Sequence, residues 1–166
     1  MAKGKYKVLV VEDEVTLNQV YKNKLESLGY EVMTAYDGEE ALEKVRAFIP
    51  DVVLLDLMLP KKSGYEVLTD IKKDEKISNI PVMILSNLGQ DDDIKKGIDL
   101  GAIDFVVKSD IRLADLMRKI EAIFSQLPKD TRLELRERSV LVETRRVVSL
   151  HLTDEHNALK YGIESS

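Results

Sequence analysis

Five short, apolar, β-branched runs alternate with five segments of helical periodicity, and this alternation is the feature that most limits the fold. Runs that are apolar at consecutive positions suit strands covered on both faces. The runs are Tyr6–Val11, Tyr30–Thr34, Val52–Leu55, Pro81–Leu85 and Ile103–Val107. The helical segments between and after them are Thr16–Leu28, Gly38–Phe48, Gly64–Asp74, Asp91–Leu100 and Ile111–Phe124. Strict alternation predicts an α/β fold, with a doubly wound parallel sheet of five strands and five helices.

The composition excludes several classes of protein. Without cysteine, the chain has no disulfide framework, no thiolate metal site and no cysteine nucleophile. Its longest nearly uncharged runs, such as Ile80–Gln90, are far shorter than the ~20 apolar residues of a membrane helix. The 25 Lys and Arg are outnumbered by 30 Asp and Glu, which argues against a protein that coats nucleic acid. Because Met1–Lys7 and the run behind it do not resemble a signal peptide, we expect a soluble, cytoplasmic protein with no membrane contact.

The composition changes near Leu127 and Pro128. Residues 1–128 hold the whole net charge of −5, whereas residues 129–166 contain seven basic and seven acidic residues. Five of the eight arginines and both histidines lie in this last stretch. We therefore predict a domain over residues 1–128 and a C-terminal extension over residues 129–166. Alternating leucines and valines in the extension suggest two short strands followed by a short helix, too little for a complete effector domain.

Polar side chains follow four of the five predicted strands. Glu12 and Asp13 follow the first strand, Asp56 the third, Ser86 the fourth and Lys108 the fifth. Ligand sites of parallel sheets lie beyond the carboxyl ends of the strands, so these groups are expected to converge. Taken singly, each could be an ordinary capping or solvated residue, except Asp56, which directly follows a buried run.

Converging carboxylates repel one another unless a cation lies between them. A ligand set made only of oxygen favours a hard cation, and Mg²⁺ with water ligands fits best. The positive charge of Lys108 suits a ligand with several anionic oxygens, such as a phosphoryl group. An aspartate beside Mg²⁺ and a lysine can act as a nucleophile and form an acyl phosphate. The pattern thus predicts an aspartyl-phosphate site at Asp56.

On these residues the chain resembles a known family. Residues 5–127 are similar to the response-regulator receiver domain of bacterial two-component signalling. The resemblance rests on five matching segments: Glu12-Asp13, Asp56-Leu57-Met58-Leu59-Pro60 with Gly64, Ser86, Phe105 and Lys108. It implies a flavodoxin-like sheet with strand order 2-1-3-4-5.

The resemblance also implies roles for individual residues. Asp56 would accept a phosphoryl group from a histidine kinase or phosphotransfer protein. Glu12, Asp13 and Asp56 would bind Mg²⁺ through carboxylates, and Met58 through its backbone carbonyl. These roles are those of a signalling protein that catalyses its own phosphorylation and dephosphorylation and turns over no metabolite.

Three further residues would bind the phosphoryl group or carry the response. Lys108 and Ser86 would contact the phosphoryl oxygens, and Phe105 would move together with Ser86. The output would be a change in protein contacts, either with a downstream target or by self-association. Self-association would use the face formed by residues 91–100, 103–107 and 111–124, or the C-terminal extension.

The sequence departs from the family pattern at two places. Ser109 follows Lys108 where the family usually has proline, often on a cis peptide. A cis bond without proline costs about 2.5–4 kcal/mol, which favours a trans peptide, but the sequence leaves both forms open. Met58 and Leu88 lie two residues beyond the acceptor and the switch hydroxyl. Neither side chain can orient an attacking water, which predicts a long-lived phosphoryl group.

Three alternatives remain. A phosphatase of the haloacid-dehalogenase type needs a second acid two residues after the nucleophile, where this chain has Met58. A nucleotide-binding protein needs a glycine-rich loop after the first strand, where this chain has Glu12, Asp13 and Glu14. A receiver-like binding module that is never phosphorylated would be expected to lack a key residue, and none is missing. We therefore favour a phosphoacceptor receiver domain over these three alternatives.

Overall fold

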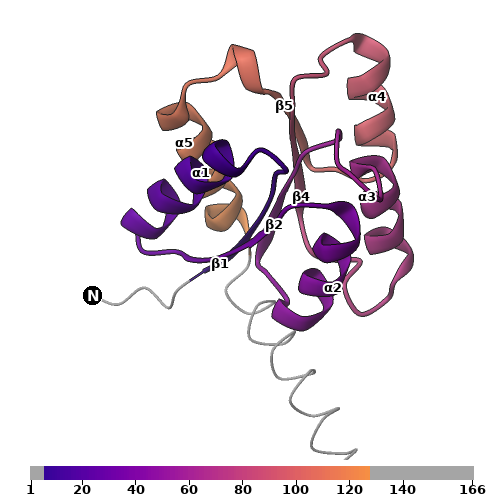
Figure 1. Ribbon diagram of the computed structural model, residues 1–166, viewed down its shortest axis with the longest axis horizontal. Coiled ribbons are helices and arrows are strands. Elements are labelled where there is room, and N and C mark those ends of the chain that lie inside the picture. The colour runs from indigo at the N-terminus through magenta and orange to yellow at the C-terminus, as the bar shows by residue number, and fades with distance from the viewer. Residues whose placement is uncertain (1–5, 128–166) are drawn as a thin grey trace, which may run out of the picture. The chain divides into compact units, whose positions relative to one another are not determined.

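The computed structural model describes residues 6–127 of the protein (Figure 1). Its strands are β1 (Lys7–Val11), β2 (Glu31–Ala35), β3 (Val52–Leu55), β4 (Val82–Ser86) and β5 (Asp104–Val107). Its helices are α1 (Val15–Ser27), α2 (Gly38–Phe48), α3 (Gly64–Lys73), α4 (Asp91–Asp99) and α5 (Leu113–Gln126). The expected alternation of strands and helices is confirmed, with boundaries displaced by at most two residues. The prediction for residues 129–166 lies outside the described part of the chain.

All strand pairs are parallel, and the strand order is β2-β1-β3-β4-β5. Figure 1 shows α1 and α5 on one face of the sheet and α2, α3 and α4 on the other. The flavodoxin-like order expected from the resemblance is confirmed. The strand order reverses direction at β1, between β2 and β3, which is where parallel sheets of this kind form their ligand site.

The three central strands are buried on both faces. Every residue of β3 and β4 is buried, as is β1 from Val8 to Val11. Helices cover both sides of the sheet, and this explains why these strands are apolar at consecutive positions. None of the helices in residues 6–127 is long and apolar enough to cross a bilayer.

Local signals start the helices close to the site. The Asp37 carboxylate accepts a hydrogen bond from the Glu40 amide at 2.8 Å and caps α2. Ser63 and Glu66 form a capping box at the start of α3, each side chain bonding the other residue's backbone amide. These caps fix where the loops that leave β2 and β3 end.

Candidate functional site

The backbones of β1, β2 and β3 stay paired for one residue beyond the strands. Val11 is in register with Leu55, and the Asp56 amide donates to the Val11 carbonyl at 3.1 Å. The Glu12 amide donates to the Ala35 carbonyl at 3.0 Å. Glu12 and Asp56 therefore leave the sheet side by side, as the parallel topology requires.

Glu12, Asp13 and Asp56 form one acidic cluster. Each offers a carboxylate oxygen, and these oxygens lie within 4.8 Å of one another. Glu12 and Asp56 are 3% and 5% exposed, whereas Asp13 faces solvent. Three carboxylates at this spacing, two of them buried, make a donor set of hard oxygens that fits Mg²⁺ with water ligands on the open side. The grouping of the three predicted metal ligands is thus present.

Burial dominates the protonation of Glu12. It raises the pKa of the Glu12 carboxyl to about 7, and the neighbouring Asp56 carboxylate adds to the rise. A hydrogen bond from Lys108 acts in the opposite direction and favours the charged carboxylate. The cluster is therefore a site where a further cation would be favourable.

The Lys108 side chain extends from the end of β5 to this cluster. Its Nζ lies 2.7 Å from Glu12 Oε2 and 2.9 Å from Asp56 Oδ2, and its side chain is 10% exposed. Burial lowers the pKa of the ammonium, but the bonds to the two acids outweigh this effect and raise the pKa above 10.5. The peptide after Lys108, which the sequence leaves open, is trans, because no cis bond occurs in the described residues; Lys108–Asp110 form a single 3₁₀ turn.

The loop after β3 is held tightly around the acceptor. The Met58 amide donates to Asp56 Oδ1 at 3.2 Å, and the Gly64 amide donates to the Leu57 carbonyl at 2.9 Å. A Cβ on Gly64 would lie 2.2 Å from the Asp56 carbonyl oxygen, so only glycine allows this approach. The Met58 side chain is 61% exposed. Metal ligation by its carbonyl remains a prediction.

The acids, Lys108 and the loop line an open cleft of about 570 Å³. Ser86 lies at the end of β4 and is fully buried, with its Oγ accepting a hydrogen bond from the Leu88 amide at 3.3 Å. The lining of the cleft includes the next residue, Asn87, rather than Ser86. In this structure Ser86 therefore adjoins the cleft without opening onto it.

Phe105 lies on β5, away from the cleft, and is half-buried against the core. Its ring packs on α4 at Gly97, where an added Cβ would lie 3.0 Å from Phe105 Cδ2 and 2.6 Å from Ile84 Cδ1. The contact means that any rotation of the ring changes the packing of α4. Roles for Ser86 and Phe105 in switching remain predictions.

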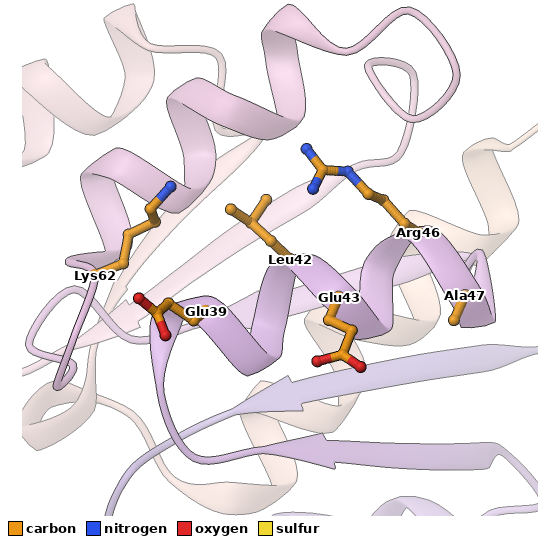
Figure 2. Close-up of a pocket in the computed structure, with 6 residues that line it drawn as sticks. All are labelled: Glu39, Leu42, Glu43, Arg46, Ala47 and Lys62. Carbon is orange, nitrogen blue, oxygen red and sulfur yellow. The ribbon is translucent and has the colours of Figure 1, made fainter.

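A second hollow lies between α2 and the start of α3 (Figure 2). Its lining residues are Glu39, Leu42, Glu43, Arg46, Ala47 and Lys62. Both of its cations form ion pairs with acids outside the hollow, Arg46 with Asp74 and Lys62 with Asp70. The side chains do not converge on a common point, so the cleft around Asp56 is the better candidate site.

One polar residue near the site was not predicted from the sequence. Asn18 on α1 is fully buried and bonds the backbone carbonyl of Glu12 at 3.0 Å. Its spacing indicates its burial, because residues 18, 21 and 25 lie on one face of the helix and the other two, Tyr21 and Leu25, belong to the core.

Solved structures of receiver domains share this fold. The receiver domain of response regulator 1452 from Francisella matches with a TM-score of 0.68 and 30% identity, covering 74% of this chain and 98% of that one. The chemotaxis protein CheY4 of Vibrio cholerae matches with a TM-score of 0.67 and 28% identity, covering 72% and 98%.

Curated proteins also match, one of them over a longer stretch. A probable transcriptional regulator, ycf27, of Guillardia theta is 42% identical over 150 residues, which cover 90% of this chain and 51% of that protein. The DNA-binding dual master transcriptional regulator RpaA of Synechocystis is 32% identical over 117 residues, covering 70% and 48%. The chain spans about half the length of the curated relatives it matches.

The family model described as response regulator receiver domain matches residues 8–121. That range contains all five strands except Lys7 at the start of β1, all three acids of the cluster and Lys108. The chain therefore belongs to the response regulator receiver domain family.

Proposed function

We propose that Asp56 accepts a phosphoryl group from a phosphohistidine of a histidine kinase or phosphotransfer protein. The observation that carries this proposal is the position of Lys108 Nζ, within 3 Å of both Glu12 and Asp56 at a cleft lined by four acidic residues. A buried carboxylate between a lysine and two further acids suits transfer of an anionic group.

In the proposed reaction, an Asp56 carboxylate oxygen attacks phosphorus. The new O–P bond forms while the P–N bond of the donor breaks, and the imidazole leaves with its electron pair and takes up a proton. Lys108 then donates hydrogen bonds to phosphoryl oxygens, which replace the Asp56 oxygen that it now contacts. Mg²⁺ bound by Glu12, Asp13, Asp56 and the Met58 carbonyl would supply positive charge to the same oxygens.

The response of the fold would begin at Ser86. Its hydroxyl now accepts a bond from the Leu88 amide, and we propose that it turns toward a phosphoryl oxygen once one is present. When the Ser86 hydroxyl turns, the space that it leaves near β4 would let Phe105 rotate inward. This rotation would alter the packing of α4 at Gly97. Local charge at Asp56 would thereby change the face formed by α4, β5 and α5.

Labelling with a small phosphodonor tests the acceptor. The full chain is incubated with radiolabelled acetyl phosphate, with and without Mg²⁺. We expect Mg²⁺-dependent labelling that Asp56→Asn abolishes. Asp99→Asn is the matched control, since Asp99 is an exposed acid on α4 paired with Lys95, and it should label like the wild type. Equal labelling of Asp56→Asn and wild type would refute the proposal, and absence of any labelling would favour a module that acts by binding alone.

We further propose that the phosphoryl group is long-lived. Met58 points into solvent and Leu88 is half-buried, and neither has a polar group that could orient a water toward phosphorus. After removal of the donor, label should persist for minutes or longer, and Met58→Asn, which supplies an amide, should shorten its lifetime. Loss of label from the wild type within seconds would contradict this reasoning.

For the output, we propose that this receiver controls a transcriptional regulator in the cytoplasm. The support is that the relatives at 42% and 32% identity carry names of transcriptional regulators, and that the first match covers 90% of the chain. Phosphorylation would act through self-association of the face formed by α4, β5 and α5. Light scattering of the full chain before and after labelling tests this, and an unchanged mass would exclude self-association.

A further inference from the structure

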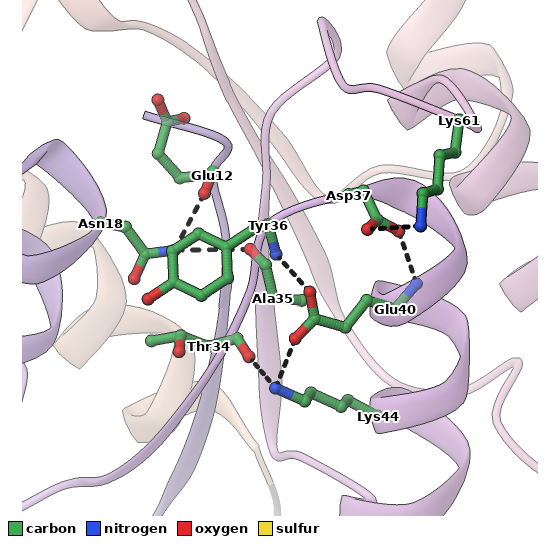
Figure 3. Close-up of polar contacts among 9 residues, drawn as sticks. All are labelled: Glu12, Asn18, Thr34, Ala35, Tyr36, Asp37, Glu40, Lys44 and Lys61. Carbon is green, nitrogen blue, oxygen red and sulfur yellow. Dashed lines mark hydrogen bonds and ion pairs between the residues drawn. The ribbon is translucent and has the colours of Figure 1, made fainter. Parts of the chain in front are cut away.

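Asn18 is a polar residue in a fully buried position of α1. Its Nδ2 donates to the Glu12 carbonyl at 3.0 Å and to the Ala35 carbonyl at 3.4 Å (Figure 3). These acceptors belong to the ends of β1 and β2. The amide therefore ties the start of the acidic loop to the neighbouring strand.

The chemistry of the two acceptors fixes the orientation of the amide. Both are carbonyl oxygens, so the nitrogen must face them, and the reverse orientation would place Oδ1 against two other acceptors. Oδ1 is itself buried and accepts no hydrogen bond from the residues that the structure describes. A buried acceptor without a partner costs free energy, whereas an apolar side chain of similar shape would avoid that cost. The asparagine therefore carries the cost of an unpartnered Oδ1 while its Nδ2 satisfies the two buried carbonyls.

The bond from Asn18 acts on the peptide group that joins the two acids. The Glu12 carbonyl belongs to the peptide between Glu12 and Asp13, and the Glu12 amide is held by the Ala35 carbonyl at 3.0 Å. Both backbone polar groups of Glu12 are thus fixed. The plane of this peptide sets the direction in which the Glu12 and Asp13 side chains leave the backbone.

We propose that Asn18 is a positioning residue that sets the affinity of the acidic cluster for Mg²⁺. It holds the peptide between Glu12 and Asp13 so that both carboxylates reach the space beside Asp56 without prior reordering. The inference rests on the proposed function, because that function assigns Mg²⁺ to the cluster. Partners that orient metal ligands typically change metal affinity by about 10-fold to 100-fold when they are removed.

A Mg²⁺ titration of the full chain, followed by backbone amide NMR shifts at constant ionic strength, measures this affinity. Asn18→Leu removes the donor and the unpartnered Oδ1 together and keeps a similar volume. We expect its dissociation constant for Mg²⁺ to rise about 10-fold or more. The urea midpoint of the metal-free protein should fall only modestly, because the lost bond to the Glu12 carbonyl is offset in part by removal of the unpartnered Oδ1. Leu25→Val on the same helix is the control, since it trims a fully buried side chain that has no bond to the acidic loop. It should lower the midpoint and leave Mg²⁺ affinity unchanged.

Asp13→Asn separates failure of this inference from failure of the proposed function. If Asp13→Asn weakens Mg²⁺ binding but Asn18→Leu binds within twofold of wild type, the positioning role is refuted and the metal site stands. If the wild type and Asp13→Asn bind Mg²⁺ alike, the proposed metal site itself is refuted. Asn18→Ser is the second variant, because its shorter side chain cannot reach both carbonyls. Wild-type affinity in folded Asn18→Ser would refute the inference equally.

Discussion

Lys108 holds together two carboxylates that would otherwise face each other inside the protein. Its Nζ lies 2.7 Å from Glu12 and 2.9 Å from Asp56, and all three side chains are at most 10% exposed. The substitution Lys108→Met keeps much of the aliphatic stem but removes the cation. It therefore tests how strongly the site depends on its own positive charge when no metal is added.

The expected loss follows from burial. Removing one partner of a buried ion pair destabilises a protein by about 3–5 kcal/mol, since the remaining charge is left uncompensated. Lys95→Met is the matched control, because Lys95 forms a pair with Asp99 in which both side chains are more than 60% exposed. Exposed pairs contribute about 0.2–1 kcal/mol, so the control should be close to wild type.

The loss should depend on pH, with a sign set by Glu12. Burial raises the pKa of Glu12 from 4.5 to about 7, and Lys108 opposes that rise, so the variant should have a still higher value. A group with a raised pKa binds its proton more readily in the folded state. The stability that it contributes is present below pH 4.5 and is lost as the pH rises through about 7. Lys108→Met should therefore lose more stability at pH 8 than at pH 5.5.

Urea unfolding of the metal-free full chain at both pH values measures these differences. Added Mg²⁺ should restore part of the stability of the variant, because a ligand that binds only the folded state stabilises it in proportion to the logarithm of its concentration. A loss below 1 kcal/mol at pH 8, or an equal loss at both pH values, would show that the carboxylates do not need this cation.

Two other substitutions test neighbouring contacts. Gly64→Ala would place a Cβ 2.2 Å from the Asp56 carbonyl oxygen, and overpacking against backbone should cost about 1–3 kcal/mol in urea unfolding and reduce phosphoryl labelling. Wild-type behaviour would show that the loop can move aside. Tyr65 donates to the Asp93 carbonyl at 3.1 Å, and its ring lies 4.2 Å from Lys96 Nζ. Tyr65→Leu should therefore speed amide exchange in α4 by about 5-fold to 10-fold, and Tyr65→Phe, which keeps the ring, by less. Unchanged amide exchange in Tyr65→Leu would show that these contacts between α3 and α4 do not stabilise α4.

Most of the fold follows from local sequence. Runs such as Val52–Leu55 are too short and too β-branched for helices, and Gly29, with φ of +92°, ends α1 where the sequence predicts a stop. The exact bounds do not follow, because strand ends depend on pairing with a neighbour. β2 begins at Glu31 rather than Tyr30, in register with Lys7 of β1.

The site is predictable to the extent that it depends on topology. Acids that directly follow parallel strands must meet at one edge, so Glu12, Asp13 and Asp56 could be grouped from their positions alone. The burial of Asn18 is only indicated by its spacing from Tyr21 and Leu25, because a single polar residue in a helix becomes buried through packing against other elements. The reach of Lys108 to two acids likewise depends on where β5 lies in the sheet.

The register between β1 and β3 limits where residues can be inserted into this chain. Val11 pairs with Leu55, and a one-residue insertion in either strand would reverse its inward and outward positions and carry an acid away from the cleft. The turn between α1 and β2, at the opposite end of the strands, has no such restriction. Around Gly29, an added Cβ would meet no atom within 4 Å. Evolutionary insertions, and peptide tags introduced by the experimenter, should be tolerated at that turn and rejected within the strands.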